Sequence, residues 1–211
     1  MARDLGPACR KCRREGIKLM LKGMRCESAK CPMEKPSRNA PPGGARAFRR
    51  GQASEYGKRL REVQKVKRYY GLFDRQFRML FRRAQRSREN TGDVLLGLLE
   101  RRLDNVLYKL GFAPSRFAGR QTISHGHVHV NGRRVNVSSY MVDIGDKISI
   151  KASERSKKLI KARLEELGEP HVQNWLRLDM TKLEADIVAF PTREDVTIPV
   201  EEQLIVEMCS Q

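Results

Sequence analysis

The stretch that decides the fold runs from Glu100 to Val137 and has the sequence ERRLDNVLYKLGFAPSRFAGRQTISHGHVHVNGRRVNV. Apolar residues in its first third recur every three or four positions, which predicts an amphipathic helix over residues 93–110. The period changes to two at Val128–Val130, and the Asn131-Gly132 pair that follows is a strong signal for a type I′ hairpin turn. The stretch therefore predicts a helix followed by a β-hairpin.

The flanking sequence adds further helices and strands. Helical periodicity predicts helices over residues 54–70, 74–86, 157–167 and 200–208. Gly71 is expected to end the first of these helices, Asp74 to cap the second, and Gly97 to break the helix over 93–110. Ser115 is a good N-cap for a short helix that ends before Gly126. Alternation predicts a strand at 148–150 and short β-like runs over 175–199.

Positive charge is concentrated at one end of the chain. The 211 residues carry 43 Lys and Arg against 25 Asp and Glu, a formal net charge of +18. Residues 1–90 hold 26 basic and 8 acidic side chains, whereas residues 91–211 hold 17 of each. Such crowding is tolerated most easily when a polyanion screens it, and each contact with a nucleic-acid phosphate adds affinity through counterion release. Nucleic acid is therefore the expected partner.

A membrane surface is the rival polyanion. No apolar run of 18 residues exists in the sequence, and no basic helix carries a strong apolar face, so no membrane partner is expected. The first four residues, Met1-Ala2-Arg3-Asp4, lack the apolar stretch of a signal peptide, which favours a cytoplasmic protein.

Four cysteines near the start have the spacing of metal ligands. Cys9, Cys12, Cys26 and Cys31 follow the pattern CxxC, thirteen residues, CxxxxC. Four thiolates complete a tetrahedron and leave no open position, so the site would be structural rather than catalytic. Zinc is expected to hold this segment together, since residues 1–35 contain few large apolar side chains. An iron–sulfur cluster is the alternative cofactor, and four free thiols are the third interpretation. Cys209 stands alone and is expected to be a small buried residue.

The deciding stretch also carries a compact set of cationic side chains. Arg116 and Arg120 are four residues apart and share one helix face, with Gln121 beside them. Histidines and arginines of the predicted hairpin follow, namely His125, His127, His129, Arg133 and Arg134. Arginine suits phosphate because its guanidinium is bidentate, and His and Gln add contacts to the 2′-OH of RNA. Two other interpretations of these side chains are a solvated charged face and a metal site at the three histidines.

Taken together, the run from Glu100 to Val137 resembles the αL RNA-binding domain of the small-subunit ribosomal protein S-four family, in its bacterial form. The cysteine segment resembles that family's N-terminal metal knuckle, and the tail PVEEQLIVEMCSQ resembles its C-terminal signature. The block Trp175-Leu176-Arg177-Leu178-Asp179 is similar to the one that precedes this tail. The resemblance covers essentially the whole chain. One departure is the terminus, Met208-Cys209-Ser210-Gln211, where similar proteins often have an aromatic pair followed by Ser and Arg.

The resemblance implies an α+β fold. An N-terminal metal knuckle and basic arm would occupy residues 1–45. A helical domain over residues 46–98 and 199–211 would be interrupted by an αL RNA-binding domain with a small antiparallel sheet over residues 99–198. The last residues would return to the helices that precede residue 100, so that Leu204, Ile205 and Met208 pack there.

The resemblance also implies the function. Family members are structural constituents of the small ribosomal subunit, are not enzymes, and take no small-molecule substrate. They bind 16S-type rRNA at a helix junction of its 5′ domain, nucleate subunit assembly, and neighbour small-subunit ribosomal protein five. They support translational accuracy near the channel through which mRNA enters, and some repress translation of their own operon.

The residues expected to contact RNA are the exposed cations of the arm, the two basic helices and the αL domain. They are Arg46, Arg49, Arg50, Lys58, Arg59, Arg61, Lys65, Lys67, Arg68, Arg75, Arg78, Arg82, Arg83, Lys109, Arg116, Arg120, Gln121, His125, His127, Arg133 and Arg134.

Two other classes of protein compete with this interpretation. An RNA-modifying enzyme would need a second, pocket-bearing domain, and the sequence has no Gly-rich phosphate loop and no GxSxG or HExxH motif. Asp104 is its one candidate acid, and it is expected to pair with Arg101 or Arg102 instead. A DNA-binding regulator would need a recognition helix, usually in a dimer, and no heptad seam is present.

Overall fold

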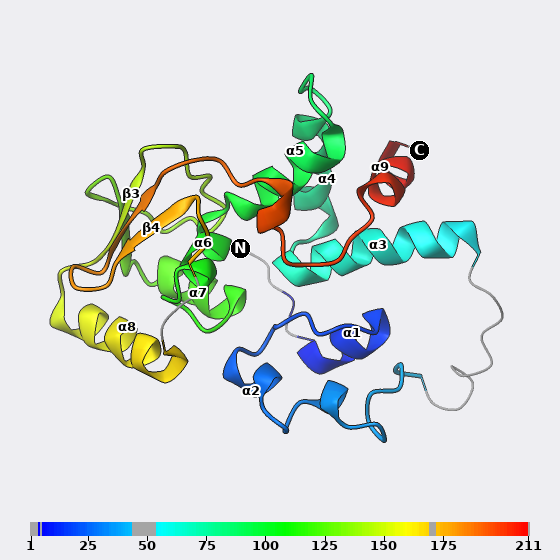
Figure 1. The fold of residues 1–211 in the computed structure, drawn as a ribbon, viewed down its shortest axis with the longest axis horizontal. Coiled ribbons are helices and arrows are strands. Elements are labelled where there is room, and N and C mark those ends of the chain that lie inside the picture. The colour runs from blue at the N-terminus through cyan, green and yellow to red at the C-terminus, as the bar shows by residue number, and fades with distance from the viewer. Residues whose placement is uncertain (1–3, 5, 44–53, 169–171, 211) are drawn as a thin grey trace. The chain divides into compact units, whose positions relative to one another are not determined.

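The computed structural model describes residues 4, 6–43, 54–168 and 172–210, which fold into two compact units (Figure 1). The first unit contains residues 1–95 and 197–211, and the second contains residues 96–196. The predicted combination of helices with a small antiparallel sheet is confirmed. No described helix has the length and apolar content that crossing a bilayer requires.

The described secondary structure of the first unit is helical, joined by turns and loops. It begins with α1 (Ala8–Glu15), α2 (Met24–Glu27) and the 3-10 turn η1 (Pro32–Glu34), and continues with α3 (Glu55–Tyr70) and α4 (Asp74–Ala84). The predicted ends of α3 are correct, because Ser54 Oγ accepts a hydrogen bond from the Gly57 N–H at 3.2 Å and Gly71 adopts a left-handed conformation (φ 64°). Asp74 is not the cap of α4; Phe73 takes that position, and Asp74 is the first helical residue.

Helix α9 (Glu202–Ser210) brings the C-terminus back to the first unit. It packs along α3, where Arg59 Nε donates to Glu207 Oε2 at 2.6 Å. Just before α9, the hydroxyls of Tyr69 and Thr197 are 2.7 Å apart, and Ile205 is buried. The return of the last residues to the preceding helices, which the resemblance implied, is therefore confirmed for α3.

The second unit combines a five-stranded antiparallel sheet with helices, in the described part of the chain. The strands are β1 (Val128–Val130), β2 (Arg133–Arg134), β3 (Lys147–Ile150), β4 (Leu176–Asp179) and β5 (Glu184–Ile187), in the order β2-β1-β3-β5-β4. The predicted hairpin turn is confirmed, since Asn131 and Gly132 have φ values of 51° and 76° between the paired residues Val130 and Arg133.

Three helices share one apolar core with this sheet. They are α6 (Leu103–Lys109), α7 (Arg116–Ser124) and α8 (Glu154–Leu167). Leu107, Ile123 and Ile160 of these helices lie in the same buried cluster as Val128 and Ile148 of the sheet, and each of the three is fully buried. One face of the sheet is thus covered, which leaves the hairpin and the C-terminal end of α7 at the surface.

The helix predicted over residues 93–110 is two helices, and the break does not fall at Gly97. Helix α5 (Thr91–Glu100) ends before an extended Arg102 (ψ 134°), and α6 begins at Leu103. The backbone of this break pairs with a distant segment: the Leu103 N–H donates to the Tyr140 carbonyl at 2.9 Å, and the Val142 N–H donates to the Arg101 carbonyl at 3.0 Å. This long-range pairing interrupts the helix where local sequence favoured its continuation.

Candidate nucleic-acid interface

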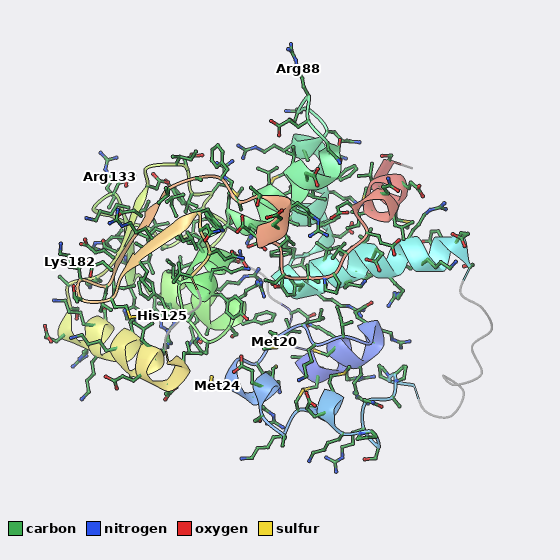
Figure 2. All side chains as sticks on the ribbon, in the orientation of Figure 1. Met20, Met24, Arg88, His125, Arg133 and Lys182 are labelled. Atoms are coloured by element: carbon green, nitrogen blue, oxygen red, sulfur yellow. The ribbon has the colours of Figure 1, made fainter. Side chains whose placement is uncertain are left out.

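The first candidate surface lies where α7 ends and the hairpin begins. This hairpin surface consists of Gln121, His125, His127, Arg133 and Arg134; all are exposed except His127, which is half-buried. Figure 2 shows Arg133 extending away from the second unit, and His125 lies on the same unit. The ring centroids of His125 and His127 are 6.1 Å apart, and Arg134 packs on Gly126 between them. Gln121 and Arg133 are exposed on the elements to either side.

Backbone geometry fixes part of the hairpin surface. Gly126 has a left-handed conformation (φ 73°), and a Cβ added there would collide with the guanidinium of Arg134. The guanidinium therefore rests directly on the glycine backbone, where any side chain would displace it. This packing holds an exposed cation in place, which lowers the entropy that it loses when it binds a phosphate.

The surroundings of His127 favour its neutral form. Its Nδ1 lies 2.8 Å from Ser156 Oγ at the start of α8. Burial lowers the pKa of His127, and the positive charges of His125, Arg163 and Lys151 lower it further. Lys151, whose N–H donates to the His127 carbonyl at 2.8 Å, is an exposed cation beside the surface that the sequence analysis did not select. Its position directly after a predicted strand was the available signal.

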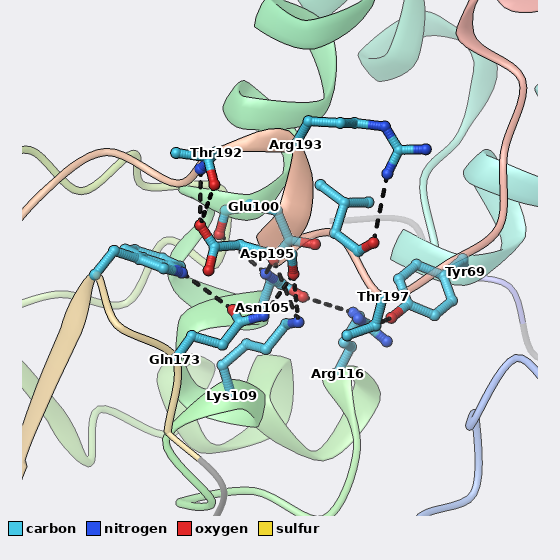
Figure 3. A network of polar contacts seen from close by, with 12 residues as sticks. Tyr69, Glu100, Asn105, Lys109, Arg116, Gln173, Thr192, Arg193, Asp195 and Thr197 are labelled. Atoms are coloured by element: carbon cyan, nitrogen blue, oxygen red, sulfur yellow. Dashed lines mark hydrogen bonds and ion pairs between the residues drawn. The ribbon is translucent and has the colours of Figure 1, made fainter.

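Arg116 and Arg120 do share one face of α7, but this face points into the unit. Arg116 is only 3% exposed, its Nε donates to Asn105 Oδ1 at 2.7 Å, and its guanidinium lies 4.5 Å from the ring centroid of Tyr108. Asn105 in turn donates to Glu100 Oε2 at 2.6 Å, as Figure 3 shows. Arg120 Nε donates to the buried Asp104 Oδ2 at 2.6 Å. Arg116 is therefore buried, and Arg120 is half-buried and paired with Asp104.

Lys109 belongs to the same buried network. Its Nζ lies 3.9 Å from Glu100 Oε2 and donates to the Asp195 carbonyl at 3.2 Å (Figure 3). Gln173 Nε2 donates to the same carbonyl at 2.5 Å. Lys109 therefore helps to hold the 3-10 turn η3 (Arg193–Asp195) against α6, and its ammonium group is turned inward.

The basic residues of α3 are largely neutralised within the protein. Each of the six has a carboxylate partner: Lys58 with Glu55, Arg59 with Glu207, Arg61 and Arg68 with Glu15, Lys65 with Glu62, and Lys67 with Asp74. The carboxylate of Glu15 is 1% exposed, and burial raises its pKa although the arginines oppose the shift. It connects α1 to α3 within the first unit.

The second candidate surface lies on α4 and is defined by Arg75, Arg78, Arg82, Arg83 and Arg86. We refer to it as the α4 arginine surface; all five side chains are exposed. Arg78 Nε pairs with Asp74 at 2.7 Å, and among the described residues the other four arginines make no ion pair. The three remaining predicted contacts, Arg46, Arg49 and Arg50, lie outside the described residues.

The cysteine segment forms the start of the first unit. Cys12, Cys26 and Cys31 are buried and Cys9 is half-buried, and none of the four is in a disulfide. The Lys22 N–H donates to Cys26 Sγ at 3.3 Å. Burial raises the pKa of the Cys12 thiol, and the nearby Cys26, Cys9 and Cys31 contribute to the shift. Within the described ranges, no three His, Cys, Asp or Glu side chains are arranged to hold a metal ion.

Comparison with known proteins identifies the family of the chain. The model of the ribosomal protein S4/S9 N-terminal domain matches residues 3–100, and that of the S4 domain matches residues 101–148. Small ribosomal subunit protein uS4 of Thermus thermophilus is 49% identical over 211 residues, and its counterpart in Halothermothrix orenii is 50% identical. Protein uS4A of Symbiobacterium thermophilum is 49% identical, and in all three pairs both chains are covered completely. The chain therefore belongs to the family of small ribosomal subunit protein uS4.

Proposed function

We propose that this protein is a structural constituent of the small ribosomal subunit that binds rRNA directly. The family is structural and not enzymatic, and its members work in the ribosome, in the cytoplasm. The observation that carries the RNA-binding role for this chain is the hairpin surface, on which Arg133 and Arg134 are exposed and Arg134 is held against Gly126. Exposed guanidinium groups on the same hairpin and helix end as histidine and amide side chains suit phosphate and 2′-OH contacts.

The finer parts of the role are proposals that rest on the resemblance. The expected RNA target is a helix junction in the 5′ domain of 16S-type rRNA, where binding would nucleate assembly of the subunit. The expected neighbours are small-subunit ribosomal protein five and the mRNA as it enters the subunit, where the protein would support accuracy. Repression of its own translation would use the same RNA-binding surfaces.

Replacing the arginines of the hairpin surface tests the RNA-binding role. Arg133→Gln with Arg134→Gln should weaken binding to a 5′-domain rRNA fragment by about tenfold or more, because each charge-assisted hydrogen bond contributes about 1.5–3 kcal/mol. The slope of log K against log salt should fall by about two, one for each lost phosphate contact. Filter binding across a range of salt concentrations measures both quantities.

The matched control removes the same charge elsewhere on the second unit. Arg177 and Lys182 are exposed on and beside β4, so Arg177→Gln with Lys182→Gln changes the net charge equally. This control should bind as the wild type does. Equal losses in the two double variants would mean that net charge, and not the hairpin surface, determines affinity.

We also propose that the cysteine segment binds a structural metal ion, with zinc favoured over an iron–sulfur cluster. The support is the burial of Cys12, Cys26 and Cys31 together, and the N–H···S bond to Cys26, in a segment with few large apolar side chains. Protein purified without chelator should contain one equivalent of zinc by elemental analysis, without the visible absorbance of an iron–sulfur cluster.

Metal removal should unfold only the start of the first unit. Chelation, or Cys9→Ser with Cys12→Ser, should abolish the helical signal of α1 and leave the αL domain folded, because metal binding and folding of such a segment are one event. An unchanged spectrum and unchanged protease resistance of this segment after chelation would contradict a structural metal. Cys209→Ser, at a cysteine far from the pattern, is the control.

A further inference from the structure

We propose that the α4 arginine surface binds an RNA nucleotide whose base is unpaired, with the base against Met79 and the flanking phosphates on the surrounding arginines. This inference rests on the proposed RNA-binding function and goes further, because it specifies the kind of nucleotide that one surface takes. It is carried by an exposed apolar side chain in an open concavity whose other lining residues are five arginines and one aspartate.

Met79 is 61% exposed, and five of the six residues that line the concavity with it are arginines. It lies with Asp74 and the five arginines of the α4 arginine surface along a concavity of about 900 Å³. Arg75, Met79 and Arg82 follow one another at steps of four and three residues, so they project from one side of α4. Arg86 lies in the turn just after the helix and lines the same concavity. A volume of this order is in the range of small-molecule binding sites.

The charge of this concavity is available to a ligand. Its one carboxylate, Asp74, is already paired with Lys67 at 2.7 Å and with Arg78 at 2.7 Å. The hydrogen bond from Lys67 holds the pKa of Asp74 below its usual range, so Asp74 stays ionised and keeps both partners. Arg75, Arg82, Arg83 and Arg86 make no ion pair within the described part of the chain. By contrast, every basic residue of α3 has a carboxylate partner.

The chemistry of Met79 favours a base rather than a duplex backbone. The backbone of paired RNA presents phosphate oxygens and ribose hydroxyls, which a thioether does not bind. A thioether is polarisable and makes favourable contacts with aromatic rings, and unpaired bases are recognised through such contacts with their faces. Guanidinium groups around the thioether can hold the phosphates on either side of that base in bidentate geometry.

An acidic peptide with an apolar side chain is the competing occupant. The number of guanidinium groups favours RNA, since four arginines without internal ion-pair partners, among the residues described, surround a single apolar side chain. A short RNA strand with one unstacked base likewise brings several negative charges and one apolar surface. A docking peptide usually brings several apolar anchors.

Two single substitutions in the full-length protein separate the base contact from the phosphate contacts. Met79→Gln keeps the length and helix propensity of the side chain and removes its apolar end. Arg82→Gln removes one phosphate contact. Met180→Gln is the matched control, because Met180 is exposed on the second unit. Circular dichroism confirms that each variant is folded, and filter binding then uses two probes: a 5′-domain rRNA fragment with unpaired junction nucleotides, and a fully paired RNA duplex of about 20 base pairs, long enough to span a double-stranded RNA site.

Met79→Gln should weaken binding to the junction fragment about three- to tenfold and leave binding to the duplex within about twofold of the wild type. Arg82→Gln should weaken binding to both probes, and Met180→Gln to neither. Unchanged affinity of Met79→Gln for both probes, or equal losses on both, would overturn the inference while leaving the proposed function intact. An acidic, leucine-containing peptide serves as a third probe. If Met79→Gln lost binding to this peptide and kept its affinity for both RNAs, that result would also overturn the inference. If the wild type bound the fragment no more tightly than the duplex, the proposed function would fail as well.

Discussion

Asp104 is a buried carboxylate that two guanidinium groups share. Arg102 donates to both of its oxygens at 3.1 and 2.9 Å, and Arg120 donates to Oδ2 at 2.6 Å. The expectation that Asp104 pairs with Arg102 is confirmed; Arg101 instead pairs with Asp143 and lies over the ring of Phe190. A carboxylate engaged in this way serves the packing of α6 against α7.

Removing the charge of Asp104 should strongly destabilise the second unit. Asp104→Asn leaves two cations facing a neutral amide at a buried site, and breaking one partner of a buried ion pair costs about 3–5 kcal/mol. Chemical denaturation measures the loss. Asp143→Asn is the control, because its side chain is exposed and an exposed pair contributes about 0–1 kcal/mol. Losses of similar size in the two variants would show that Asp104 is not the centre of this network.

The sequence predicted which residues share a helix face, but it did not predict whether that face meets solvent or the interior. The spacing of Arg116 and Arg120 correctly placed them on one face of α7. Whether this face meets solvent or the interior depends on Asp104 and Asn105, which another helix supplies. The spacing of two arginines does not reveal such buried polar partners, so the sequence favoured an RNA contact.

The sequence predicted the ends of helices and the turn wherever neighbouring residues alone determine them. Ser54 and Ser115 accept hydrogen bonds from N–H groups three residues ahead, and the Asn131-Gly132 turn needs only its own two φ angles. The break between α5 and α6 was not predictable, since the segment over residues 140–142 pairs with it from a distant part of the chain. The exposed cations of α4 were foreseen, but the pairing of Arg59, Arg61 and Arg68 was not, because Glu207 and Glu15 are distant in sequence.

Close packing of α6 and α7 depends on Gly119. A Cβ at this position would lie 2.8 Å from the Asp104 carbonyl oxygen, so Gly119→Ala should force the helices apart and destabilise the second unit by about 1–3 kcal/mol. Gly97 of α5 is the matched glycine, since the nearest atom to its added Cβ is the Pro191 carbonyl oxygen at 3.8 Å. Gly97→Ala should stabilise its helix by up to about 1 kcal/mol. Thermal unfolding of both variants checks the pair, and a stable Gly119→Ala protein would contradict the close approach.

At the scale of the whole molecule, which has a net charge of +18, some cations are paired within the protein and others stay exposed. The cations of α3, together with Lys109, Arg116 and Arg120, are turned toward carboxylates, carbonyls or amides of the chain itself. The hairpin surface and the α4 arginine surface keep exposed guanidinium groups that a polyanion can neutralise. We therefore expect a discrete RNA footprint rather than contact with every basic residue.

Chemical footprinting on naked small-subunit rRNA tests this central claim most directly. The wild type should protect a limited set of nucleotides in the 5′ domain. Arg133→Gln with Arg134→Gln should lose one subset of these protections, and Arg177→Gln with Lys182→Gln should lose none. Protection spread evenly along the rRNA, or a 5′-domain pattern that the hairpin variant leaves unchanged, would contradict the account.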